Sequence, residues 1–377
     1  MRTHVYPRRI EGCWLLRGRD KRGHKCPRWG ARTLRSRLRG TRCSLFSYPR
    51  SRRWRLGVSP PSEGIHALVY YALVLVFALL TVVPAYAEKN LARPPGTTRY
   101  KTMVRDLNAL LSYDKMHEKC MVLSSLGHSV RGRNLWMVTL GSGPKRIFYL
   151  CRQHGHEPAS TEGALAFIDM VVKADTDSLI ATSLKSVTVY VVPMANPDGS
   201  EAFLRHNAHG ADLNRDWITR REPETKALYR AISKVRPDLL ADQHELYPDD
   251  TRPDFTEVVA KGSGASEKVI TICQDVQMVV TGAMSAEGFP LVAHTVTDTH
   301  PARLAHRFYA INLDVPTVLF ETNRLAGTKR TVEERAAAHE RFMMTLLRYL
   351  GGERDVLVSE AAGHPALPPP TEQKGTN

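Results

Sequence analysis

The chain has 377 residues, of which 42% are hydrophobic and 24% are charged, and this composition excludes a fibrous or a wholly disordered protein. A net charge of +15 is typical of polyanion-binding proteins, but residues 1–64 contain 18 of the 53 basic residues and only three of the 38 acidic ones. The rest of the chain is therefore neutral, and nucleic acid is not expected as a partner of the mature domain.

Residues 1–64 are rich in Arg, Gly, Ser and Pro and show no apolar period that could bury one face. Such a segment cannot offset the entropy of ordering it, so we interpret it as a basic disordered leader. A mis-assigned start codon would account for its presence. The alternative is a basic arm for nucleic acid or anionic lipid, which the scarcity of aromatic residues disfavours.

An uncharged apolar run occupies residues 67–83 and is followed by the small-residue pattern Ala85-Tyr86-Ala87. Together they predict a signal peptide over residues 65–87, cleaved after Ala87, and hence a secreted or periplasmic protein. The alternative is an uncleaved membrane anchor that leaves the downstream domain outside the membrane. A membrane is expected as a partner only in that second case.

From residue 98 onward, short apolar strands alternate with segments of helical spacing. Strands are predicted at residues 135–140, 147–151, 187–192, 239–241 and 317–320. Helices are predicted at residues 102–111, after a cap at Ser160 or Thr161, at 224–235, and after a capping box of Thr331 and Glu334. The alternation predicts an α/β fold, a single domain over residues 98–355 with a mostly parallel, mixed central sheet flanked by helices. Residues 358–377 are expected to form a disordered tail.

Polar residues are concentrated just past the carboxyl ends of four of these strands. They lie at residues 152–158, 196–217 and 242–245 and at Glu321. Because ligands of open α/β sheets bind in the crevice beyond the carboxyl ends of the strands, these segments are expected to meet at one site.

The residue types in these segments fit a zinc hydrolase, which uses three protein ligands and leaves a fourth position for water. His154 and Glu157, three residues apart on a strand-to-helix turn, can both face one ion, and His244 would complete the set from a neighbouring strand end. His156 is a competing ligand. We place it in the cleft wall because His154 lies nearer to the strand end.

The order of motifs over residues 98–350 resembles that of the zinc carboxypeptidase family, the carboxypeptidase A type. The shared pattern is His-x-x-Glu at 154–157, Asn-Pro-Asp-Gly at 196–199, Arg at 205 with Asp-x-Asn-Arg at 212–215, and a strand-end His and Glu at 244 and 321. Residues 126–133 also match the family's Gly-x-Ser-x-x-Gly-Arg turn. Such agreement in order is far less probable by chance than a single motif.

The resemblance implies a catalytic role for each strand-end residue. His154, Glu157 and His244 would hold one Zn²⁺ ion, which acidifies a bound water and polarises the scissile carbonyl. Glu321 would be the general base, and Arg205 would stabilise the oxyanion. The alternatives are that Glu321 only caps a turn and that Arg205 lies on the surface.

The resemblance also implies how the substrate is held. Asn214 and Arg215 would bind the terminal carboxylate of a peptide with a free C-terminus, since a guanidinium fork suits a carboxylate. The implied enzyme is a metallocarboxypeptidase that hydrolyses the C-terminal peptide bond. Gly155-His156 stands where well-known members have an Arg, and Glu245 adds a negative charge next to the third ligand.

Two other functions are compatible with the same motifs. The export signal and the short interval between residues 196 and 214 also suit an amidase or carboxypeptidase that acts on cell-wall peptides. A non-catalytic relative that binds peptide ends is the third candidate. Loss of a metal ligand or of the base would be its mark, and the sequence retains all four residues.

Overall fold

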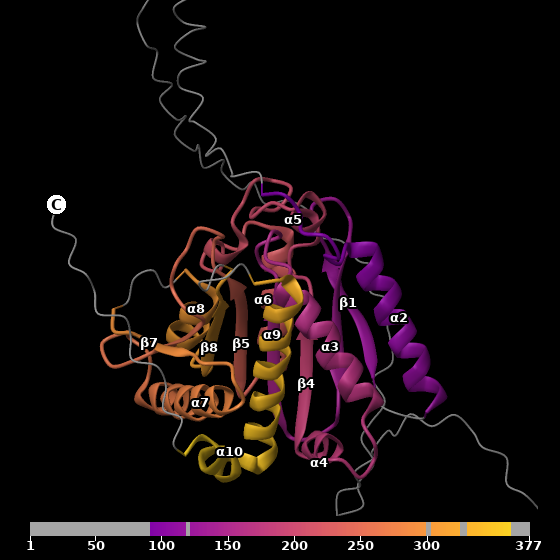
Figure 1. Cartoon of the computed structure of the whole chain (residues 1–377). Helices are drawn as coiled ribbons and strands as arrows, with labels where there is room; N and C mark the ends of the chain where they lie inside the picture. Colours follow the sequence, from indigo (N-terminus) through magenta and orange to yellow (C-terminus); the bar gives the residue numbers. More distant parts are fainter. Residues whose placement is uncertain (1–90, 118–120, 299–302, 325–329, 363–377) are drawn as a thin grey trace, which may run out of the picture. The chain divides into compact units, whose positions relative to one another are not determined.

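The computed structural model describes residues 91–117, 121–298, 303–324 and 330–362. The predicted leader, the predicted signal or anchor over 65–87 and residues 363–377 of the predicted tail lie outside these ranges. The described residues form a mixed α/β domain whose helices flank one eight-stranded sheet (Figure 1).

The strand order of the sheet is β1-β2-β4-β3-β5-β8-β6-β7. The strands are β1 (Val122–His128), β2 (Asn134–Leu140), β3 (Lys145–Cys151), β4 (Val187–Val192), β5 (Leu239–Glu245), β6 (Phe255–Val259), β7 (Val292–Val296) and β8 (Thr317–Thr322). The pairs β4-β3, β3-β5, β5-β8 and β6-β7 are parallel, whereas β1-β2, β2-β4 and β8-β6 are antiparallel. The prediction of a mostly parallel, mixed sheet is therefore confirmed.

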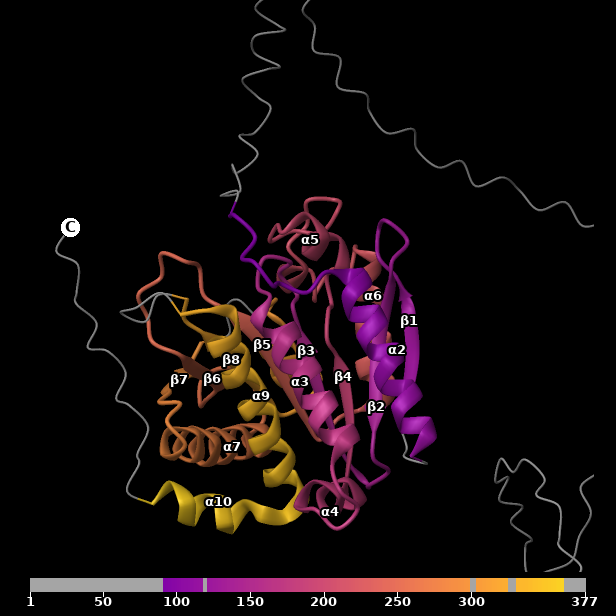
Figure 2. The same ribbon diagram turned by 45° about the vertical axis from the view of Figure 1, so that its right-hand side comes forward.

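Helices cover both faces of the sheet, and each face has its own apolar core. The helices are α2 (Tyr100–Met116), α3 (Ala159–Lys173), α4 (Leu179–Ser186), α5 (Pro197–Ala202), α6 (Pro223–Val235), α7 (Glu267–Ala286), α8 (Ala305–Asn312), α9 (Val332–Arg348) and α10 (Arg354–Ala361). Helices α2, α3, α7 and α9 contribute to the larger core, with α3 and α9 side by side across the sheet (Figure 2). Helices α6 and α8 pack with Trp217 on the other face. Because the central strands are covered on both sides, the buried stretch of β3 and nearly all of β4 are apolar in sequence.

The start of α3 differs from the prediction. The helix begins at Ala159 with Pro158 as its N-cap, so Ser160 and Thr161 lie inside it rather than capping it. The backbone N–H of Ala159 instead donates to the carboxylate of Glu245 (2.6 Å), which belongs to β5. An acceptor from a distant strand thus replaces the local cap that the sequence indicates.

The capping box predicted for the last long helix is confirmed. Thr331 accepts from the backbone of Glu334 (3.2 Å), and the Glu334 carboxylate accepts from the backbone of Thr331 (2.7 Å). Helix α9 ends at Arg348 and is followed by a helical turn over Tyr349–Glu353, in which Gly352 has a φ of 110° that suits glycine. Helix α10 then continues to Ala361, so the first residues of the segment predicted as a tail are helical.

Helix α7 is long and apolar enough to cross a membrane by length and composition alone, the one such helix in the described ranges. Most of its apolar stretch is buried, and it packs in the larger core. It is therefore a core helix. Cys151 and Cys273 are buried and unpaired, and burial raises the pKa of both thiols, which suits core positions rather than a nucleophile.

Candidate active site

Three side chains that the sequence predicted as metal ligands come together at the carboxyl edge of the sheet. His154 and Glu157 lie on the turn between β3 and α3, and His244 lies near the end of the adjacent parallel strand β5. The turn packs so closely on the backbone of Gly199 that a Cβ on Gly155 would lie only 2.0 Å from it. Glycine is therefore required for the turn to reach this position.

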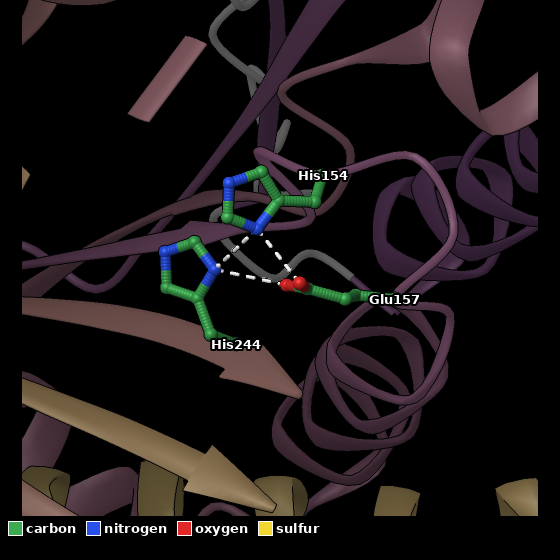
Figure 3. Close-up of side chains that lie close together, drawn as sticks. All are labelled: His154, Glu157 and His244. Atoms are coloured by element: carbon green, nitrogen blue, oxygen red, sulfur yellow. Dashed lines mark hydrogen bonds and ion pairs between the residues drawn. The ribbon is translucent and has the colours of Figure 1, made fainter. Parts of the chain in front are cut away.

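The ligand atoms of the three side chains converge on one point (Figure 3). Nδ1 of His154 lies 2.7 Å from Oε1 of Glu157, and Nδ1 of His244 lies 2.9 Å from Oε2. The two Nδ1 atoms are 3.1 Å apart, and all three residues are buried. Two imidazoles and one carboxylate in this arrangement form a donor set that zinc prefers.

A second carboxylate lies behind each histidine. Nε2 of His154 is 3.2 Å from Oδ1 of Asp212, and Nε2 of His244 is 3.0 Å from Oδ1 of Asp242. Each carboxylate favours the tautomer with its proton on Nε2, so that the Nδ1 lone pair faces Glu157. These partners support His154 and His244 as ligands.

The electrostatics of this group favour a positive charge among the ligands. Although burial opposes it, Asp242 and Glu157 raise the pKa of His244 well above its ordinary value. Burial likewise opposes ionisation of Glu157, but the two histidines hold its pKa well below the usual range. A divalent cation would meet the same demand for positive charge.

His156 is a neighbour of the ligand group. It is buried, its Nδ1 is 3.9 Å from Oε1 of Glu157, and its ring packs edge-on against Tyr247. Burial lowers the pKa of His156 to about 3. The residues whose ligand atoms converge are His154, Glu157 and His244, and His156 is outside that group.

Arg205 is directed at His154 and Glu157 and is not a surface residue. Its Nη1 lies 3.3 Å from Nδ1 of His154 and 3.8 Å from Oε1 of Glu157, while Asp212 accepts from its Nε at 2.9 Å. Burial disfavours its charge, but Asp212 and Glu157 raise its pKa above the ordinary value. The side chain is therefore a fixed cation next to the ligand group.

Asn214 and Arg215 follow Asp212 on a short 3-10 turn, Leu213–Arg215. Nδ2 of Asn214 is 3.1 Å from Nε2 of His244, and Oδ1 of Asn214 accepts from the backbone of Ala305 (2.8 Å). The backbone N–H of Ala305 thus fixes the amide beside the ring of His244. Arg215 lines the cavity, and its Nη1 donates to the carbonyl of Asn214 (3.2 Å).

Glu321 lies beside His244, because the two residues are paired across β5 and β8. Burial, together with the charge of Glu157, raises the pKa of Glu321 to about 7, against the lowering effect of His244 and Arg252. A carboxylate with a pKa near neutrality can both take up and release a proton. This property suits the base predicted from the sequence.

These side chains surround one cavity of about 230 Å³. Its lining includes His154, Glu157, Arg205, Asn214, Arg215, Tyr247, Asp250, Arg252, Phe255, Glu257, His306, Arg307, Leu319 and Glu321. Six of the seven predicted site residues therefore line one space, and the seventh, His244, touches His154 and Glu157 beside it.

The charge of Glu245 is neutralised within the protein. Its Oε2 lies 2.7 Å from Nε of Arg335 and 3.4 Å from Nε of Arg324, while its Oε1 accepts the N–H of Ala159. The sequence suggested an added negative charge near the ligands. The structure shows instead a buried ion pair that fixes α3 and α9 to β5.

The Asn-Pro-Asp-Gly motif at 196–199 is hydrogen-bonded to the turn at 126–133. Asn196 caps α5 by accepting from Gly199 (2.9 Å), and the Asp198 carboxylate binds Ser129 (2.9 Å) and Arg133 (2.6 Å) of the Gly-x-Ser-x-x-Gly-Arg turn. Both segments therefore have a structural role, holding the chain that leads to Arg205.

Comparison with known proteins is consistent with this site. Residues 108–246 match the profile of the family described as Zinc carboxypeptidase. Carboxypeptidase SOL1 of Arabidopsis thaliana is 30% identical over 145 residues, which are 34% of this chain and 30% of the relative. Carboxypeptidase M of Mus musculus is 33% identical over 147 residues, 32% of this chain and 33% of the relative. The chain thus spans about a third of the length of these curated relatives.

Solved structures share the fold. A metallo-carboxypeptidase from Burkholderia cenocepacia superposes with a TM-score of 0.56 at 22% identity, covering 69% of each chain. The family profile thus matches over residues 108–246, as the motifs predicted, and the fold is shared with solved metallocarboxypeptidases.

Proposed function

We propose that this protein is a zinc-dependent metallocarboxypeptidase that hydrolyses the C-terminal peptide bond of peptides. The observation that carries the proposal is the convergence of His154, Glu157 and His244 on one point, each histidine backed by a carboxylate. Zinc bound there would supply a Lewis acid and an acidified water. The catalytic domain would be the segment 98–355.

The remaining residues of the site suit the other roles. Glu321, beside His244, would take a proton from the attacking water and pass it to the leaving amine, as its pKa near 7 allows. The fixed cation of Arg205, held by Asp212, would stabilise the negative charge that develops on the carbonyl oxygen. Asn214 and Arg215, which both line the cavity, would hold the terminal carboxylate.

Export of the protein, by a signal peptide over 65–87 or as a domain anchored by residues 67–83, remains part of the proposal and rests on the sequence alone. A secreted or periplasmic enzyme would meet peptides or cell-wall peptides. The two substrate classes can be separated by product analysis.

The test is metal analysis of the purified protein combined with a peptide digest read by mass spectrometry, with and without a chelator. We expect one zinc ion per chain and stepwise loss of C-terminal residues that stops on chelation and returns with zinc. A C-terminally amidated peptide is the matched control and should remain intact. Zinc binding without cleavage of any peptide or wall-derived substrate would favour a non-catalytic binder and overturn the proposal.

A further inference from the structure

Arg152, which directly follows β3, combines two unusual features. Its backbone has a φ of 56°, a left-handed conformation that residues other than glycine adopt rarely. Its side chain is fully buried, although it carries a guanidinium. A strained backbone and a buried cation both lower stability, and strain of this kind is concentrated at functional sites. The mechanism proposed above gives this residue no role.

The guanidinium of Arg152 holds the ligand turn, residues 154–157. Its Nε donates to the carbonyl of Gly155 (3.1 Å), which lies between the ligands His154 and Glu157. The backbone N–H of Gly155 donates in turn to the carbonyl of Arg205 (3.3 Å). Both polar backbone groups of Gly155 are therefore hydrogen-bonded, and the two peptide groups that flank it are fixed in orientation.

The same guanidinium binds the segment that leads into α2. Its Nη1 donates to the carbonyl of Thr98 (3.1 Å). Thr98 is itself fixed, because its backbone N–H (2.6 Å) and its hydroxyl (2.7 Å) both donate to the carboxylate of Glu162 on α3. We call residues 93–98 the N-terminal strap. Arg152 therefore connects this strap to the ligand turn.

The other end of the N-terminal strap is bound to α5. Nη2 of Arg93 donates to the carbonyls of Ser200 (2.6 Å) and Glu201 (2.8 Å), and its guanidinium carbon lies 4.9 Å from the centre of the Phe203 ring. Figure 2 shows the segment passing beside α5 on its way to α2. The strap is therefore a fixed support for Arg152.

The shape of the guanidinium suits this connection. Burial lowers the pKa of Arg152 to about 10, against the effect of Glu162, so the group remains a cation at neutral pH. It binds two backbone carbonyls, and its Nη2 is buried without a hydrogen bond in the described part of the chain. A lysine would present one compact ammonium, whereas the planar guanidinium has donors in fixed directions.

We propose that Arg152 is a positioning residue of the metal site. By binding Gly155 and Thr98 together it holds the ligand turn in the arrangement that binds zinc, and through it the N-terminal strap contributes to the zinc affinity. The inference rests on the proposed function, because it takes His154, Glu157 and His244 as zinc ligands. It adds a residue and a segment that regulate how tightly that site holds its metal.

The first test measures the zinc dissociation constant of the full chain in competition with a chelator and without a peptide substrate. Arg152→Met keeps an unbranched apolar stem but removes both hydrogen bonds, so the dissociation constant should rise by about 10- to 100-fold, as is typical when support of a metal ligand is lost. Arg152→Lys, which retains a donor, should restore part of the affinity. An unchanged dissociation constant in Arg152→Met overturns the inference.

The matched control is Tyr149→Phe. Tyr149 is buried on β3, and its hydroxyl donates to the carbonyl of Met343 on α9 (2.6 Å), so the variant loses a buried hydrogen bond away from the ligand turn. It should lower the melting temperature and leave the zinc dissociation constant unchanged. An equal rise of the dissociation constant in Tyr149→Phe and Arg152→Met would assign the effect to a general loss of stability and refute a positioning role.

A second variant covers the case in which Arg152→Met does not fold. Glu162→Gln leaves Arg152 and the ligands in place but replaces the carboxylate that accepts two hydrogen bonds from Thr98. Amide hydrogen exchange of the chelator-treated protein should become faster at residues 153–157 and stay unchanged in β3 and β5. The zinc affinity should fall, by less than in Arg152→Lys. Unchanged exchange and affinity in Glu162→Gln and Arg152→Lys contradict the inference.

These outcomes are separate from those that test the proposed function. If the unmodified chain binds zinc but cleaves no peptide, the proposed function fails, and the comparison of zinc affinities still decides the role of Arg152. If the unmodified chain binds no zinc, both fail.

Discussion

Asp212 and Asp242 determine which nitrogen of each histidine can bind a metal. Each carboxylate is hydrogen-bonded to an Nε2 atom, so the Nδ1 atoms face Glu157 and each other. Histidine ligands of zinc generally have such a partner, and it fixes both the tautomer and the ring. The ligand set therefore depends on two residues that do not themselves touch its centre.

Glu321 is predicted to be essential for turnover and dispensable for metal binding. Glu321→Gln removes the proton acceptor but keeps the side-chain volume beside His244, so kcat should fall by about 100- to 10,000-fold. Zinc content should stay at the level of the unmodified protein, since the carboxylate is outside the ligand group. The measurement is steady-state kinetics together with metal analysis.

Two variants delimit this prediction. His244→Ala should lose the metal and the activity together, because it removes a ligand that is 1% exposed. Substitution of the exposed Glu267 should change neither the zinc content nor the activity. Full activity in Glu321→Gln would exclude the assignment of the base.

Arg215 is predicted to recognise the free C-terminus. Arg215→Ala removes the guanidinium from the cavity wall while leaving Arg205 and its pair with Asp212 in place. We expect KM for peptides with a free terminus to rise by about tenfold or more, as for the loss of a charged hydrogen bond. Rates on amidated peptides should change little. Retained discrimination between free and amidated peptides would place the carboxylate elsewhere.

The sequence predicted the residues that lie directly past strand ends, and it did not predict those whose position depends on pairing between distant strands. His154, Glu157 and His244 follow apolar runs, so their meeting point could be expected from the rule for parallel sheets. Glu257 and His306 lie in segments that were not assigned to any element. Asp242 could have been predicted, because it lies two residues before His244 on the same strand and residues two apart on a strand point to the same face.

At the scale of elements, α9 is bound to the sheet through a buried polar contact. His339 on α9 is fully buried, with Nδ1 2.9 Å from Oε1 of Gln243 on β5 and Nε2 3.2 Å from the hydroxyl of Thr322 on β8. Burial lowers the pKa of His339 from 6.5 to about 3, so the folded protein keeps this ring neutral. In the unfolded chain the ring of His339 is protonated at a pH near the ordinary pKa of histidine.

This difference predicts a loss of stability in acid. A folded-state pKa below the unfolded one means that the unfolded chain binds the extra proton between pH 6.5 and 3, so the stabilisation is complete above 6.5 and declines as the pH falls. Between pH 7 and 5 the contribution of His339 to the free energy of unfolding should fall by about 2 kcal/mol. Urea titrations of the unmodified protein and of His339→Gln measure it.

The variant should have lower stability at pH 7 but a smaller decrease between pH 7 and 5. His128→Gln, an exposed histidine on β1, should reproduce the slope of the unmodified protein. Parallel curves for His339→Gln and the unmodified protein would show that the buried ring is protonated in the folded state.

The elements that the sequence missed lie mainly in residues 250–312. β6 and β7 have five residues each, and β7 includes partly exposed positions, so neither gives a clear apolar run. Their place in the sheet is set by the pairing of β6 with β8 and of β7 with β6 rather than by local pattern. The long runs at 147–151 and 187–192 were predictable because those strands are buried on both faces.

At the scale of the whole molecule, the ligand group connects two strands and the start of a helix. His154 and Glu157 belong to the turn from β3 to α3, and His244 belongs to β5, which also binds α9 through Glu245 and Arg335. Without a bound cation, the short distance between the two Nδ1 atoms and the burial of several carboxylates lower the stability of the folded state. A metal that binds only the folded state is therefore expected to stabilise the domain as a unit.

Removal of the metal should accordingly lower the melting temperature. Zinc at about a thousand times its dissociation constant adds about 4 kcal/mol to the free energy of unfolding, which corresponds to a shift on the order of 10 °C for a domain of this size. Scanning calorimetry of the zinc-loaded and the chelator-treated protein should show this shift, and zinc should reverse it.

In His154→Ala the calorimetric traces with and without zinc should nearly coincide, because one ligand and its link to Asp212 are gone. His128→Ala should behave like the unmodified protein. Coincident traces for the unmodified protein would mean that the three side chains do not bind the ion, and the mechanism built on them would fail with that result.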